Sequence, residues 1–284
     1  MTDRALRAMT DDGAFRMMAV RTTETVRALL RAQKVEGEAA RALAELVTGC
    51  ILFRETMAPT LRVQAILKGA GGSGTIVGDS HPDGWCRGLV QHKPDAPPFR
   101  LDKGAVLQMM RSLPNGELHQ GVVEVDRSGF SEALMVYMQL SEQIETVARC
   151  AVVFEGGEVK AAGGYLVQLL PEAPDREAAV MILAQRLEDD FDDIHERIAA
   201  TDASPDHLVE EVFYGMPFTL LGDSEVRWGC DCSHVRVLSS LATLSRGDLE
   251  ELLEGNAPLE IGCDWCGKEY RVDPEDLRHL LEPS

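Results

Sequence analysis

Apolar and polar residues alternate or recur along the first 170 residues in patterns that predict a domain of mixed strands and helices. Alternation over short runs predicts strands at residues 14–21, 61–67, 120–125, 147–154 and 159–170. Recurrence every three or four residues predicts helices from about residue 22 to 30, 36 to 57 and 130 to 140. A Gly156-Gly157 turn between two strands is typical of a hairpin. We therefore expect residues 1–170 to form an α+β core domain organised around antiparallel sheet.

A different pattern begins after Pro171 and Pro174. Six apolar residues follow one another at steps of three or four and would share one face of a helix: Val180, Leu183, Leu187, Phe191, Ile194 and Ile198. A run of Asp and Glu within residues 188–193 opposes this stripe. We expect residues 171–228 to form an acidic helical linker. The stripe either packs permanently on the first domain, or docks only while something holds it and is then exposed to bind other proteins.

Four of the seven cysteines form two tight pairs near the C-terminus. The pairs are Cys230-Asp-Cys232 and Cys263-Asp-Trp-Cys266, separated by thirty residues. Four thiols brought together by a fold can present four sulfurs to one ion, and tetrahedral all-sulfur coordination suits zinc. Two such pairs separated by a loop are far more specific than a lone CxxC. The sequence therefore predicts one zinc ion held by these four cysteines.

The same cysteines are candidates for redox chemistry. Zinc-bound sulfurs are thiolates, the form that oxidants attack, and each pair holds its sulfurs close enough to form a disulfide if the metal leaves. The site is either a latch that opens on oxidation or a zinc clamp that never switches, and the spacing leaves both open. The surrounding module, residues 229–284, is small enough that its folding should depend on the metal.

Charge and composition exclude several classes of function. Residues 171–284 contain 9 Lys and Arg against 27 Asp and Glu, which is nearly all of the net charge of −19. Such an acidic segment repels phosphate backbones, so we expect no nucleic-acid partner. No apolar run is long enough to span a membrane, and the first residues lack a signal-peptide core, so we expect a cytoplasmic protein.

The first domain offers no catalytic arrangement of residues. Its glycine-rich stretch, residues 69–74, matches a dinucleotide fingerprint in spacing but continues as a strand instead of opening a helix. No Ser/His/Asp set or paired carboxylates stand in a recognisable context. We therefore expect a protein that is not an enzyme. A disulfide oxidoreductase remains the rival hypothesis, and it would need an exposed reactive cysteine in a thioredoxin-like context, whereas Cys263 is predicted in a hairpin.

The whole chain resembles the redox-regulated heat-shock holdase family of about thirty-three kilodaltons. The two cysteine pairs carry most of this resemblance, supported by Gln120-Gly-Val-Val, Ser141-Glu-Gln, Ala161-Ala-Gly-Gly164 and the Leu43-Ala-Glu-Leu helix. Trp265 stands where the family has a smaller aromatic residue, and the positions after Ser233 also differ. Both differences lie beside the metal ligands and bear on how readily oxidant reaches them.

The resemblance implies a specific function. The reduced, zinc-bound form would be inactive, and oxidation would release zinc and pair Cys230 with Cys232 and Cys263 with Cys266. The linker would then lose structure and bind unfolding client proteins without ATP, and the oxidised protein would form a homodimer. A static zinc-ribbon adaptor is the alternative of a different class.

Overall fold

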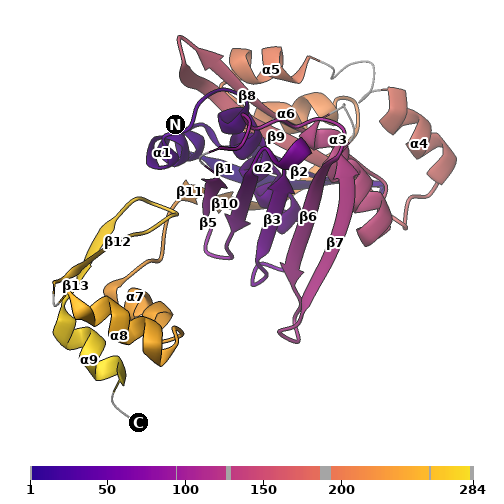
Figure 1. Ribbon diagram of the computed structural model, residues 1–284. Helices are drawn as coiled ribbons and strands as arrows, with labels where there is room; N and C mark the ends of the chain where they lie inside the picture. The colour runs from indigo at the N-terminus through magenta and orange to yellow at the C-terminus, as the bar shows by residue number, and fades with distance from the viewer. Residues whose placement is uncertain (1, 94, 126–128, 186–192, 256, 282–284) are drawn as a thin grey trace. The chain divides into compact units, whose positions relative to one another are not determined.

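The chain divides into two compact units, Met1–Gly229 and Cys230–Ser284. The structure is a computed structural model, and it describes residues 2–93, 95–125, 129–185, 193–255 and 257–281 (Figure 1). Among these residues, no helix combines the length and the apolar character needed to cross a membrane.

A five-stranded antiparallel sheet forms one half of the first unit. Its strands lie in the order β10-β1-β2-β9-β8. They are β1 (Arg4–Thr10), β2 (Phe15–Arg21), β8 (Thr146–Glu155), β9 (Glu158–Leu169) and β10 (Phe218–Glu225). Two glycines of β9 allow tight packing, because a Cβ at Gly164 would lie 2.2 Å from the carbonyl oxygen of Arg149, and one at Gly163 would lie 2.4 Å from that of Val20.

A six-stranded sheet forms the other half, in the order β11-β5-β4-β3-β6-β7. Its strands are β3 (Val63–Lys68), β4 (Thr75–Ser80), β5 (Trp85–Gln91), β6 (Ala105–Ser112), β7 (Leu118–Val125) and β11 (Arg227–Trp228). All neighbours pair antiparallel except β11, which runs parallel to β5 at the sheet edge. The glycine-rich stretch is a short 3₁₀ turn, Ala70–Gly72, that joins β3 to β4 as a hairpin.

Helix α2 (Gly37–Glu55) contacts strands of both sheets and lies between them (Figure 1). It is buried on nearly all sides, as expected of a helix whose apolar residues are not confined to one stripe. Helices α1 (Thr23–Gln33) and α3 (Phe130–Tyr137) pack beside it, and α3 runs on into a π-helical turn, Met138–Glu142. The main hydrophobic core surrounds α2, and the thiols of Cys50, Cys86 and Cys150 are buried in it, as small apolar residues would be.

The described part of residues 171–228 packs largely on the five-stranded sheet. Helices α5 (Ile194–Thr201) and α6 (Pro205–Val212) contact it on the face away from α2, and they close a second core with Tyr165 and Phe213 (Figure 1). Helix α4 (Arg176–Ala184) precedes them. The segment then supplies both β10 and β11, each at the edge of a sheet.

The described part of the second unit, residues 230–255 and 257–281, contains three helices and one hairpin. Its elements are α7 (His234–Leu241), α8 (Arg246–Glu254), β12 (Leu259–Gly262), β13 (Glu269–Val272) and α9 (Pro274–Leu281). The apolar side chains at its centre are Leu249, Val272 and Leu277, with leucines of the three helices partly buried around them. A capping box between Ser245 and Asp248 begins α8.

The expected α+β class with antiparallel sheet is confirmed. The structure adds a second sheet and strands β1, β5, β6 and β10, which the hydrophobic pattern did not predict. The linker contains strands as well as the expected helices. A domain boundary at residue 170, with a linker up to residue 228, stays a prediction.

Candidate metal centre

The four paired cysteines come together in the second unit. Cys263 and Cys266 stand on the turn between β12 and β13, while Cys230 and Cys232 precede α7. Their four sulfur atoms all lie within 4.8 Å of one another. Among the described residues, no other group of Cys, His, Asp or Glu gathers three or more ligand atoms in this way.

A tight turn shapes the Cys263–Cys266 half of the site. The carbonyl oxygen of Cys263 accepts hydrogen bonds from the amides of Cys266, at 3.3 Å, and Gly267, at 2.7 Å. Gly267 has a φ of +70°, a left-handed conformation that favours glycine. The amide of Lys268 then donates to the sulfur of Cys266. This turn directs both sulfurs to the same side.

The other half of the site is fixed by the start of α7. Ser233 caps this helix by accepting a hydrogen bond from the amide of Arg236 at 3.3 Å. Asp231, between the two cysteines, forms an ion pair with Arg236 at 2.5 Å. The amide of Cys232 donates to the sulfur of Cys230. The helix start thus sets the direction of the first cysteine pair.

The sulfur positions fit a tetrahedral metal ion. Cys230 Sγ lies 3.8 Å from Cys263 Sγ, and Cys232 Sγ lies 3.4 Å from Cys266 Sγ. Zinc–sulfur bonds of about 2.3 Å in a tetrahedron place neighbouring sulfurs about 3.8 Å apart. Both contacts join one pair to the other, so the hairpin and the start of α7 meet at the sulfurs. A metal bound there would link segments that are thirty residues apart in the chain.

The pKa values of three of the four thiols are shifted by their surroundings. Burial raises the pKa of Cys230 and, together with hydrogen bonds to neighbouring thiols, raises the pKa of Cys266 to about 12. Burial also acts to raise the pKa of Cys232, but hydrogen bonds from Tyr270 and the other thiols outweigh it and lower this pKa to about 7. Of these three thiols, Cys232 is the one that ionises most readily. Four adjacent thiolates require a positive ion among them.

Tyr270 is the site residue that sequence reasoning missed. It is buried on β13, and its hydroxyl donates a hydrogen bond to Cys232 Sγ at 3.0 Å. The available signal was its place two residues before Val272, because alternate residues of a strand share a face and Val272 belongs to the small core. His234, a candidate substitute ligand by sequence, instead has its Nε2 3.2 Å from the carbonyl oxygen of Arg271 and lies outside the cluster.

The apolar stripe is only partly described. Ile194 and Ile198 lie on the buried face of α5, with 4% and 0% of their surfaces exposed. Val180 on α4 is 40% exposed. Leu187 and Phe191 lie outside the described residues, as does the side chain of Leu183. The two buried members pack against the five-stranded sheet of the first unit, which both alternatives for the stripe expect of the docked state.

Comparison with known proteins gives one consistent family. The Hsp33 protein family model matches residues 3–273. A 33 kDa chaperonin of Syntrophotalea carbinolica is 28% identical, over 99% of this chain and 100% of that protein. A 33 kDa chaperonin of Thermosynechococcus vestitus is 30% identical, over 99% of this chain and 97% of that protein.

A solved structure shares the fold over its full length. The crystal structure of the 33 kDa chaperonin of Thermotoga maritima superposes with a TM-score of 0.85 at 23% identity, covering 99% of this chain and 98% of that one. The family model covers nearly the whole chain, and the clustered cysteines lie near its C-terminal end. The chain therefore belongs to the Hsp33 family, the redox-regulated, non-enzymatic chaperones with a C-terminal four-cysteine zinc site.

Proposed function

We propose that Cys230, Cys232, Cys263 and Cys266 bind one zinc ion in the reduced protein, and that their oxidation converts the protein into an ATP-independent holdase. The observation that carries this proposal is the cluster of four sulfurs within 4.8 Å of one another in a unit with a very small core. An all-sulfur tetrahedral donor set suits zinc better than magnesium or calcium, which prefer oxygen.

The metal supplies folding free energy to the second unit. When bound, zinc would hold four thiolates together and contribute about 10 kcal/mol or more to folding. Burial of Leu249, Val272 and Leu277 contributes far less, about 2 kcal/mol for each fully buried side chain before the entropy of the chain is subtracted. The folded second unit should therefore be lost when the thiolates are oxidised.

Oxidation is balanced by one peroxide for each cysteine pair. A thiolate attacks a peroxide oxygen, and the O–O bond breaks. The cysteine becomes a sulfenic acid, and hydroxide is the leaving group. The neighbouring thiolate then attacks that sulfur, an S–S bond forms and a second hydroxide leaves. Two protons from solvent convert the hydroxides to water, so each pair loses two electrons and each peroxide gains two. The pairs we propose, Cys230–Cys232 and Cys263–Cys266, follow the family resemblance.

Client binding is proposed for the linker, residues 171–228. Chain connectivity supports its coupling to the switch, because a single residue, Gly229, separates β11 from Cys230. Strands β10 and β11 are edge strands, which detach at lower cost than central ones. Release of the linker would expose Ile194 and Ile198 beside Val180. With Leu183, Leu187 and Phe191 these residues would form the apolar client-binding stripe.

Partners and compartment follow from the same proposal. The clients are unfolding proteins that expose apolar segments. The net charge of −18 on residues 171–284 would keep the opened segment expanded and its client complexes in solution. We further propose a homodimer in the oxidised state and a cytoplasmic location, where clustered cysteines serve metal or redox work more often than structural disulfides.

The proposal predicts that peroxide releases zinc and creates holding activity together. Reduced protein treated with peroxide at a mildly denaturing temperature should release one zinc per chain, followed with a chromogenic chelator. The same samples should keep a heat-unfolded enzyme in solution. Zinc retained without holding activity would indicate a static zinc adaptor, and catalytic turnover of a disulfide substrate by the metal-free protein would indicate an oxidoreductase.

Tyr270→Phe should weaken metal retention without unfolding the site. The change removes the hydroxyl that donates to Cys232 Sγ and keeps the buried ring. Loss of a hydrogen bond to a ligand typically lowers metal affinity about tenfold or more. Competition with a zinc chelator measures this affinity, and Tyr214→Phe, at a tyrosine 78% exposed in the first unit, is the matched control. Equal affinities in the two variants would show that the hydroxyl does not support the site.

Ile198→Ala should make activation easier. The side chain is fully buried under α5, and its truncation should cost about 2–5 kcal/mol, mostly by weakening the docking of this helix. We expect the variant to gain holding activity at a lower temperature under peroxide than the original protein. Ile182→Ala, on the exposed side of α4, is the control. If both variants switch at the same temperature, undocking of α5 does not contribute to activation.

A further inference from the structure

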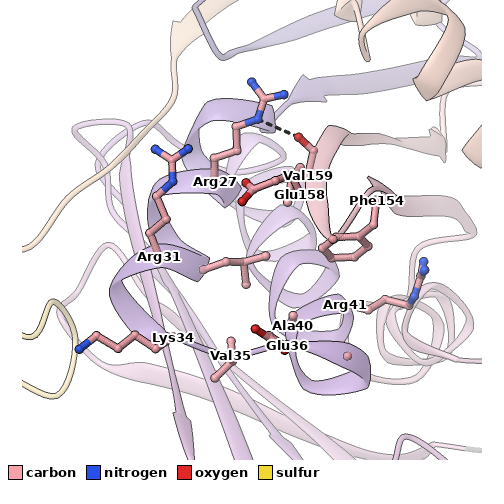
Figure 2. A pocket seen from close by; sticks show the side chains of 13 residues that line it. Arg27, Arg31, Lys34, Val35, Glu36, Ala40, Arg41, Phe154, Glu158 and Val159 are labelled. Carbon is pink, nitrogen blue, oxygen red and sulfur yellow. Dashed lines mark hydrogen bonds between the residues drawn. The ribbon is translucent and has the colours of Figure 1, made fainter.

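A cleft in the first unit is lined by residues of that unit alone. It has a volume of about 690 Å³ and opens between the end of α1, the beginning of α2 and the turn of the β8–β9 hairpin (Figure 2). Clefts that hold small molecules usually have volumes of about 300–1,000 Å³. This cleft is therefore large enough for a compact ligand.

Four cations line the cleft, against two carboxylates. Arg27 and Arg31 lie one turn apart on α1, Lys34 is the residue that ends this helix, and Arg41 stands on the first turns of α2 (Figure 2). The carboxylates are Glu36 and Glu158. In a chain with a net charge of −19, a concave surface with an excess of positive charge is unusual and favours an anion.

Two of these cations are available for a ligand. Arg27 donates to the carbonyl oxygen of Val159 at 2.8 Å and pairs with Glu24 at 2.7 Å, and Arg41 donates to the carbonyl oxygen of Val152 at 3.1 Å. The side chains of Arg31 and Lys34 have neither an ion pair nor a side-chain hydrogen bond within the part of the chain that the structure describes, and both are exposed. Glu24 and Glu45 thus offset the charges of Arg27 and Arg41, the latter at 4.0 Å, which leaves Arg31 and Lys34 to bind an anion.

The lining between the charges is apolar. Leu30, Val35, Phe154 and Val159 contribute to it, and the Phe154 ring already lies 5.7 Å from the guanidinium carbon of Arg41. Gly37 and Gly157 also border the cleft, and their φ angles of +64° and +89° are left-handed conformations that favour glycine. A flat apolar group can therefore lie against the ring while an anionic group reaches the cations.

We propose that this cleft binds a small molecule that joins a phosphate group to a flat apolar body, the chemistry of a nucleotide. Arg31 and Lys34 bind the phosphate oxygens, and Phe154 stacks on the body. Glu36 and Glu158 accept hydrogen bonds from amino or hydroxyl groups of the body. The site is independent of the cysteine switch and requires no chemical step.

Isothermal titration calorimetry of the reduced, zinc-loaded full chain tests this proposal with three probes. ADP presents both halves of the ligand, inorganic pyrophosphate presents the anion alone, and adenosine presents the body alone. We expect ADP to bind one site per chain and more tightly than either other probe. ADP binding should also weaken as salt rises, because its phosphates meet exposed cations.

Variants of the cleft test which side chains bind the phosphate group and which bind the apolar body. Arg31→Gln with Lys34→Gln should weaken ADP binding about tenfold or more, the usual loss on removing charge-assisted hydrogen bonds. Arg100→Gln with Lys103→Gln removes the same charge at exposed positions outside the cleft and should leave binding unchanged. Phe154→Leu should weaken ADP but not pyrophosphate.

Several results would overturn the proposal. These are absence of saturable ADP binding, equal losses in the two double variants, or pyrophosphate binding as tightly as ADP. Cations in the last turn of a helix also complement its dipole, as Arg31 does in α1. If the cleft double variant only lowered thermal stability and kept full ADP affinity, these side chains would have that structural role alone.

Discussion

The interaction on which the second unit is proposed to depend is the coordination of one cation by four thiolates. Sulfurs held within 4.8 Å of one another repel when ionised, and hydrogen bonds from Tyr270 and the other thiols lower the pKa of Cys232 to about 7. A metal ion reverses that repulsion and ties the start of α7 to the β12–β13 hairpin. Among the described residues of this unit, the buried core cluster consists of Leu249, Val272 and Leu277, which is a small core for an independent unit. We therefore propose that removal of the metal unfolds this unit.

The first unit should remain folded when the clustered cysteines are oxidised. Its main core surrounds α2 between two sheets, and its cysteines are buried thiols whose pKa values are raised by burial. Protonated, buried thiols react poorly with oxidants. Oxidation should thus act on the four clustered cysteines and spare Cys50, Cys86 and Cys150. We expect α5, α6, β10 and β11 to be intermediate in stability. They pack on the surface of the first unit or at the edges of its sheets.

The sequence predicts those parts of the fold that depend on local pattern. Helix α2, the β8–β9 hairpin and the β12–β13 hairpin follow from periodicity and turn residues, and the cysteine cluster follows from its spacing. Strands β1 and β10 were missed because each depends on the other across more than 200 residues, in pairs such as Arg4 with Glu225. Strand β5 was missed because Arg87 and Gly88 break its apolar pattern, whereas in the fold Arg87 bonds to the buried Asp79. Tyr270 supports Cys232 through a contact that only tertiary structure creates.

Hydrogen exchange followed by mass spectrometry, on reduced zinc-bound and on peroxide-oxidised protein, is the most direct test of the central claim. The claim is that metal binding holds the second unit folded and that its loss frees the linker. After oxidation, we expect amides of β12, β13 and α8 to lose protection, together with those of α5, α6 and β10. Amides of α2, β8 and β9 should keep theirs. Unchanged protection of β12 and β13 after zinc has been released would contradict the account.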